Sequence, residues 1–138
     1  IPKPAGEPDA QLAAAVKELT VKLPEHFDDL DFSRALSETW SLVQLANRKV
    51  EEGAPWKLAK DPAQKGKLDR ILYDLAETIR LLAIFTQPVM PGISAKVLEQ
   101  LGMAKTALLF DRDTQWGLLP GGQTLGALAP LFPKEVPV

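Results

Sequence analysis

Residues 31–60, DFSRALSETWSLVQLANRKVEEGAPWKLAK, contain the clearest structural pattern in the chain. Asp31 is a favoured helix N-cap. The mainly apolar positions after it recur every three or four residues, a spacing that keeps one face of a helix apolar: Phe32, Ala35, Leu36, Thr39, Leu42, Val43, Ala46 and Val50. Gly53 is a natural left-handed stop, and Pro55 cannot continue the helix. The stretch predicts a helix over residues 32–52, followed by a turn or a single helical turn over residues 54–60.

The same spacing predicts three further helices. The first runs from Ala10 to about Leu23, with Asp9 as its N-cap. Another follows Asp61 and Pro62 and ends before Pro88. The last runs from about Pro91 to Gly102. The strongest apolar periodicity belongs to the third helix in chain order, and we expect its stripe to be core: Leu68, Ile71, Leu72, Leu75, Ile79, Leu82, Ala83 and Phe85.

The periodicity ends after Gly102, where Gly117, Gly121, Gly122 and Gly126 signal turns. The sequence therefore predicts an all-α helical bundle with an irregular C-terminal tail. We assign residues 1–104 to the bundle and residues 105–138 to the tail. The tail is expected to pack on the bundle or on a neighbouring domain, with Trp116 as an anchor and a short strand pairing around residues 107–110.

Composition excludes several kinds of chemistry. The chain of 138 residues has a net charge of −2, one histidine and no cysteine. Disulfides, thiolate zinc sites, iron–sulfur clusters and cysteine nucleophiles are therefore excluded, and His26 alone favours neither a histidine metal site nor a Ser-His-Asp hydrolase. Asp28, Asp29 and Asp31 fit helix capping better than a calcium loop. No apolar run approaches the roughly 18 residues of a membrane span. We find no catalytic constellation.

Trp56 follows Pro55 at the turn between two predicted helices, near Lys57 and Lys60. Local sequence favours an indole buried under the turn, although an exposed indole would be a platform for an unpaired base. Between residues 48 and 70, seven Lys and Arg residues outnumber four Asp and Glu. This local positive charge is a modest indication of nucleic-acid binding. Trp40, in the middle of the second helix, is expected at the edge of the core.

Three stretches together resemble bacterial methionyl-tRNA synthetases, which are class I aminoacyl-tRNA synthetases: LANRKVEEGAPWKLAK (45–60), LYDLAETIRLLAIFTQPVMP (72–91) and TQWGLLPGGQTLG…PLFPK (114–134). The resemblance implies the C-terminal anticodon-binding bundle, which recognises the CAU anticodon of methionine tRNAs. It implies that Trp56 stacks on the first anticodon base and that Pro55 shapes the turn. Asn47, Arg48 and Glu51 match supporting positions of the motif. Lys57 and Lys60 are candidate phosphate contacts.

The resemblance also implies a larger cytoplasmic enzyme, a methionine–tRNA ligase that uses ATP, of which this part carries no catalytic residue. No cofactor is expected here; ATP and magnesium, with zinc as a further candidate, belong to the parent enzyme. The expected partners are methionine tRNA and the catalytic domain of the same chain, and neither a membrane nor DNA. One family helix is expected before Ile1. The alternative is a helical protein-interaction module that docks a partner through its tail, which a fully buried Trp56 and a neutralised basic patch would favour.

Overall fold

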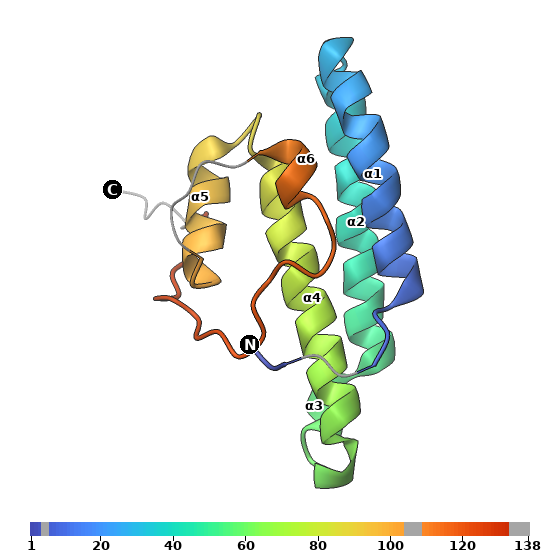
Figure 1. The fold of residues 1–138 in the computed structure, drawn as a ribbon, viewed down its shortest axis with the longest axis vertical. Coiled ribbons are helices and arrows are strands. Elements are labelled where there is room, and N and C mark those ends of the chain that lie inside the picture. The colour runs from blue at the N-terminus through green and yellow to red at the C-terminus, as the bar shows by residue number, and fades with distance from the viewer. Residues whose placement is uncertain (4–5, 104–108, 133–138) are drawn as a thin grey trace, which may run out of the picture.

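The computed structural model describes residues 1–3, 6–103 and 109–132. Its helices are α1 (Ala10–Asp28), α2 (Phe32–Gly53), α3 (Pro55–Leu58), the 3₁₀ turn η1 (Pro62–Gln64), α4 (Lys65–Thr86), α5 (Pro91–Gln100) and α6 (Phe110–Asp113). Figure 1 shows α1 and α2 as a long antiparallel pair, with α4 beside them and α5 on the other side of α4. Within the described ranges there is no strand. The predicted all-α bundle is confirmed.

The first helix runs further than its sequence predicts. The carboxylate of Asp9 caps α1 as expected, accepting hydrogen bonds from the N–H groups of Gln11 and Leu12. The predicted end at Leu23 is wrong, because α1 continues through Pro24 to Asp28. An internal proline costs about 3 kcal/mol. Here the buried face continues beyond it to His26, so packing against α2 outweighs the loss.

The turn between α1 and α2 contains a leucine in a left-handed conformation. Leu30 has φ 57°, and the N–H of Asp31 donates to the His26 carbonyl over 2.8 Å. This closure usually places glycine at the position of Leu30. Asp31 caps α2 by accepting from the Arg34 N–H, whereas Asp28 and Asp29 lie at the end of α1. The capping role predicted for the aspartates therefore holds for Asp31.

The hydrophobic core lies where α1, α2 and α4 meet, which explains why these helices need apolar faces. Partly buried Phe110 and Trp116 bring the region after α5 onto the same core, so Trp116 contacts the bundle. The buried core residues are Leu12, Val16, Leu19 and Leu23 of α1, Ala35 and Leu42 of α2, and Leu81 and Phe85 of α4.

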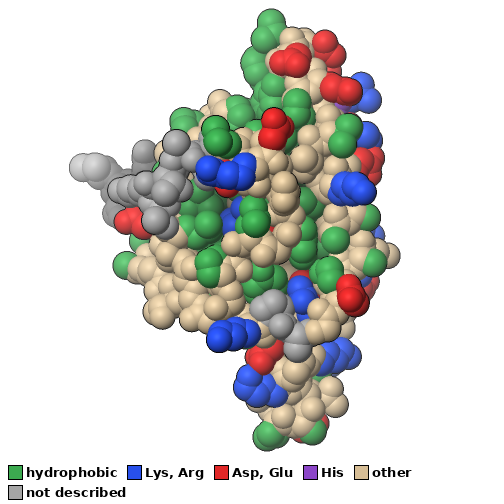
Figure 2. Space-filling model, in the orientation of Figure 1, with side chains coloured by type: hydrophobic (Ala, Val, Ile, Leu, Met, Phe, Trp, Pro, Cys, Tyr) green, Lys and Arg blue, Asp and Glu red, His purple; other side chains and the backbone are tan. Residues whose placement is uncertain are grey.

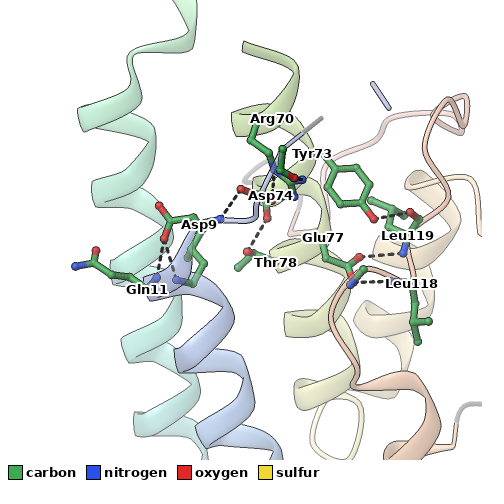
Figure 3. A network of polar contacts seen from close by, with 12 residues as sticks. Asp9, Gln11, Arg70, Tyr73, Asp74, Glu77, Thr78, Leu118 and Leu119 are labelled. Carbon is green, nitrogen blue, oxygen red and sulfur yellow. Dashed lines mark hydrogen bonds and ion pairs between the residues drawn. The ribbon is translucent and has the colours of Figure 1, made fainter. Parts of the chain in front are cut away.

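Two buried charged residues of α4, Glu77 and Arg80, hold the segment after α6, and we call them the tail clamp. Their side chains are paired over 2.7 and 2.8 Å. The Glu77 carboxylate also accepts from the N–H groups of Gly117, Leu118 and Leu119. Figure 3 shows the Glu77 carboxylate facing Leu118 and Leu119. Arg80 donates to the carbonyls of Asp113 and Gln115. The clamp thus binds backbone groups of the tail.

The apolar stripe of α4 is core only in part, which corrects the sequence prediction. Leu72 and Ile79 are 39% and 46% exposed. They line a groove of about 630 Å³ together with residues of α5 and of the tail, including Val97, Leu125 and Leu128. Hydrophobic side chains gather between α4 and α5 on the face shown in Figure 2. The tail clamp occupies the polar side of α4, so the buried surface of this helix combines the charged clamp with only part of the apolar stripe, including Ala83 and Phe85.

The end of α5 agrees with its prediction. Gly102 has φ 75°, its N–H donates to the Glu99 carbonyl, and the N–H of Met103 donates to Leu98. These bonds close the helix in the manner that favours glycine. Of the strand pairing expected around residues 107–110, positions 107 and 108 lie outside the described residues, and Phe110 begins α6. The boundary between bundle and tail at residue 104 remains a prediction.

Candidate nucleic-acid interface

The joint between α2 and α3 places Trp56. Ala54 is left-handed, with φ 42° and ψ 60°, and its N–H donates to the Val50 carbonyl over 3.0 Å. Pro55 then begins α3, the single helical turn that the sequence predicts. The left-handed residue is therefore Ala54 rather than Gly53, and this detail of the prediction is wrong. Gly53 is instead the point of close approach to α4, where an added Cβ would lie 3.0 Å from Ile71 Cδ1.

The Trp56 side chain is not a buried plug under this turn. The residue is 54% exposed, and α3 contains no buried residue. Local sequence alone favours burial, so that expectation is wrong. An exposed indole beside a proline in a short helix has a free face on which a planar group can stack.

The three supporting residues lie on the last turns of α2. Asn47, Arg48 and Glu51 are all exposed. Asn47 and Glu51 are four residues apart, so they share one helix face, and Arg48 lies at its edge. α2 ends at Gly53 and Trp56 follows at once, so all of these side chains belong to one end of the bundle. The set combines an aromatic ring, an amide, a guanidinium and a carboxylate.

Several cations at this end make no ion pair. Lys49 pairs with Asp9 over 3.0 Å, Lys65 pairs with Asp69 over 2.5 Å, and Arg70 pairs with Asp74. No ion pair within the described part of the chain involves Arg48, Lys57, Lys60 or Lys67. Lys and Arg side chains gather toward the lower end of the face in Figure 2, whereas carboxylates gather at the upper tip. Unpaired lysines beside an exposed aromatic can contact phosphates.

The two features expected of a protein-interaction module are both missing at this end. Trp56 is half exposed, and four of the seven local cations, counted over the described residues, are unpaired. The described part of the tail, residues 109–132, is bound to α4 through the tail clamp. These observations do not favour the alternative function.

Sequence reasoning misplaced a second tryptophan. Trp40, expected at the core edge, is 59% exposed on α2. His26 is buried as a satisfied side chain, with Nε2 2.9 Å from Glu38 Oε2. Trp40 lies one residue off the apolar stripe of α2, and this position in the sequence indicates an exposed side chain.

Within residues 1–3, 6–103 and 109–132 there is no cluster of three His, Cys, Asp or Glu side chains able to hold a metal ion. None of the helices in these ranges combines the length and the apolar character needed to cross a membrane.

Comparison with known proteins identifies this arrangement. The family model that matches residues 2–136 is described as the anticodon binding domain of methionyl tRNA ligase. The class of protein is therefore a helical anticodon-binding domain. The chain belongs to the methionyl-tRNA ligase family, as the resemblance in its sequence indicates.

Individual relatives agree. The chain is 38% identical over 136 residues to the methionine–tRNA ligase of Caldanaerobacter subterraneus, covering 97% of this chain and 21% of that protein. It is also 38% identical to the Bacillus subtilis methionine–tRNA ligase, covering 87% of this chain and 18% of the relative. The chain thus spans about a fifth of the length of these curated relatives.

Solved structures share the fold. Mycobacterium tuberculosis methionyl-tRNA synthetase in complex with methionyl-adenylate superimposes with a TM-score of 0.88 at 30% identity, over 97% of this chain and 27% of that chain. Its apo form gives a TM-score of 0.85 at 29% identity, over 99% and 28%. The matched part is the anticodon-binding domain, which is the non-catalytic part of such an enzyme.

Proposed function

We propose that this chain binds the anticodon loop of methionine tRNAs and reads their CAU anticodon. In this proposal the indole of Trp56 stacks on the first anticodon base, and Pro55 fixes the turn that presents it. The observation that carries the proposal is the half-exposed Trp56 ring at the end of the bundle with the unpaired cations. RNA sequence is read where single-stranded loops splay bases onto aromatic faces and their edges form hydrogen bonds.

The neighbouring side chains have complementary roles. The Asn47 amide and the Arg48 guanidinium supply hydrogen-bond donors for a base edge, and the Glu51 carboxylate supplies an acceptor for the exocyclic amino group of cytosine. Lys57 and Lys60 contact the phosphates of the loop. Within a whole ligase, the domain would hold the tRNA while the catalytic domain of the same chain, using ATP and magnesium, attaches methionine to the distant 3′ end.

The test is a titration with RNA stem-loops that bear a CAU anticodon, followed by tryptophan fluorescence. A matched loop differs only in the first anticodon base. Trp56→Ala should weaken binding of the CAU loop by about 1–3 kcal/mol, the loss expected for one stacked base, and should abolish the preference between the two loops. Equal affinity of the unmodified chain for both loops would contradict the proposed reading of the anticodon.

Salt dependence tests the phosphate contacts separately. For single strands, the logarithm of the association constant falls with the logarithm of salt concentration by about 0.7 per phosphate contact. Lys57→Ala and Lys60→Ala should each reduce that slope by roughly one contact and leave the preference for cytosine unchanged. Lys22→Ala on α1, in an exposed pair with Glu18, is the matched control and should leave the slope unchanged.

A further inference from the structure

The end of α2 that carries the proposed anticodon contacts has little packing to hold it. The last fully buried side chain of α2 is Leu42, in the middle of the helix. The structure describes all of residues 43–53, and none of these later side chains is fully buried. A cavity of about 280 Å³ lies beside this end, with Gly53 and Ile71 among its lining residues. Apolar packing alone therefore does not fix the last turns of α2.

An ion pair joins this end of α2 to the start of α1. Lys49 Nζ lies 3.0 Å from Asp9 Oδ2, and both side chains are partly buried. The other carboxylate oxygen, Asp9 Oδ1, accepts from the N–H groups of Gln11 and Leu12. Lys49 also lies 3.8 Å from Glu52, but that contact stays within α2. A single carboxylate thus caps α1 and holds α2.

The backbone of Asp9 continues the connection to α4. Its N–H donates to Asp74 Oδ2 over 2.9 Å (Figure 3). Asp74 is buried and accepts from Arg70 Nε over 3.0 Å, so its charge is compensated on α4. Three helices therefore meet in one series of polar contacts, from Lys49 through Asp9 to Asp74, which we call the polar link.

Lys49 lies among the residues that we propose to read the anticodon. Arg48 precedes it directly, and Asn47 and Glu51 are two residues away on either side. At about 100° per residue, two residues turn a side chain to nearly the opposite face of a helix. Lys49 thus faces α1 while Asn47 and Glu51 face solvent. A backbone displacement at Lys49 would therefore displace the residues of the proposed surface.

We propose that Asp9 and Lys49 are positioning residues for anticodon recognition: their ion pair fixes the last turns of α2, and Lys49 acts on the protein rather than on RNA phosphates. The inference rests on the proposed function and extends it to two residues behind the anticodon surface. Without the ion pair these turns occupy other positions for part of the time. The fraction of molecules that are ready to read the base then falls, and the apparent affinity falls with it.

Asp9→Asn tests the ion pair with the shape of the side chain kept. The asparagine oxygen still caps α1, but its NH₂ group cannot accept a hydrogen bond from the Lys49 ammonium. The preference for the CAU stem-loop over the loop altered at the first anticodon base should fall by about two- to fivefold, the range expected for loss of such a pair. Lys49→Met should cause a similar fall, and Lys49→Arg, which keeps the charge, should retain the preference.

Salt dependence separates positioning from phosphate contact. Loss of one phosphate contact lowers the slope for single strands by about 0.7, as expected for Lys57→Ala. Lys49→Met should leave the slope unchanged, because the Lys49 charge is already paired with Asp9.

Ser94→Ala is the control for a loss of stability alone. It removes a buried hydrogen bond of 2.6 Å from the Ser94 hydroxyl to the Ala83 carbonyl, between α5 and α4. The free energy of unfolding in urea should decrease, while the preference between the loops and the salt slope should not change.

An unchanged preference in Asp9→Asn and Lys49→Met would overturn the inference while the proposed function stands. So would a salt slope that Lys49→Met lowers as much as Lys57→Ala does, because Lys49 would then contact a phosphate. An equal fall in preference for Ser94→Ala would attribute the effect to stability and would also overturn the inference. If the unmodified chain shows no preference between the loops, the proposed function fails and the inference fails with it.

Discussion

Leu30 adopts a backbone conformation that glycine adopts more easily. Its φ of 57° closes the end of α1, while its side chain is 73% exposed and gains little from burial. The left-handed conformation costs an L-residue roughly 1–2 kcal/mol. Leu30→Gly should therefore stabilise the chain by about 1 kcal/mol, measured as the free energy of unfolding in urea.

The control for this prediction is Leu30→Ala, which keeps a Cβ and thus keeps the unfavourable conformation. Its free energy of unfolding should stay close to that of the original chain. If Leu30→Gly also left the stability unchanged, the exposed leucine side chain would be making contacts that offset its backbone cost.

At the same scale, the end of α2 shows what local sequence can specify. The Gly53–Ala54–Pro55 run correctly predicts that the helix stops, because proline cannot continue it. It assigns the left-handed residue to Gly53, whereas Ala54 takes that conformation. Gly53 is required for a different reason, the close approach of Ile71 from α4. That contact is between helices, so a rule based on neighbouring residues could not supply it.

At the scale of elements, the tail clamp joins α4 to the segment after α6. Glu77 is fully buried and accepts hydrogen bonds from Arg80 and from three backbone N–H groups. Glu77→Gln keeps the shape but removes the negative charge, leaving Arg80 buried without its counter-ion. Breaking a buried pair in this way costs about 3–5 kcal/mol. We expect a loss of that size in the free energy of unfolding, with a change in Trp116 fluorescence as the tail loosens.

An exposed pair provides the comparison for the clamp. Glu18→Gln removes a charge from the solvent-exposed contact with Lys22 on α1, and it should cause no measurable change in stability. A loss for Glu77→Gln no larger than that for Glu18→Gln would mean that the clamp does not hold the tail.

The clamp also shows why α4 was predicted only in part. Its end before Pro88 agrees with the structure, but the cap predicted at Asp61 belongs to the 3₁₀ turn η1, and α4 begins at Lys65. Its buried face does not follow from the apolar spacing, because the partners of Glu77 and Arg80 are backbone groups 33 to 42 residues away. Helix periodicity treats charged residues as exposed, whereas Glu77 and Arg80 are buried by their bonds to the tail. It treats Leu72 and Ile79 as core, whereas both line the open groove beside α5. The exposure of Trp56, which local sequence did not favour, agrees with the stacking role that the family resemblance implies.

At the scale of the whole molecule, the carboxylates that join elements make stability depend on acid. The pKa of Glu38 lies below its ordinary 4.5, chiefly because of the hydrogen bond with His26. Burial raises the pKa of Asp9, but hydrogen bonds from the Leu12 N–H and from Lys49 outweigh it and leave the pKa below 3.8. Such groups bind protons less readily when folded. The stability that these carboxylates contribute is fully present when the pH is above their ordinary pKa values. It is lost as the pH falls through their lower pKa values in the folded state.

The urea midpoint should therefore fall as the pH decreases below 4.5 and again below 3.8, the ordinary values of these two groups. Asp9→Asn checks the assignment, because asparagine caps a helix about as well as aspartate but does not titrate. The variant should lose a smaller part of its stability below pH 3.8. An acid dependence identical to that of the original chain would exclude Asp9 as a source.

The joint at Ala54 and Pro55 has a consequence for the rate of association. Proline fixes its own φ, and the residue before it has fewer accessible conformations than most. The backbone that carries Trp56 is thus ordered by the fold before any RNA arrives. Less conformational entropy is lost on binding when a contact is already ordered. Binding of an anticodon loop should then require rearrangement of the RNA more than of the protein. The flexibility of the RNA loop would therefore determine the association rate.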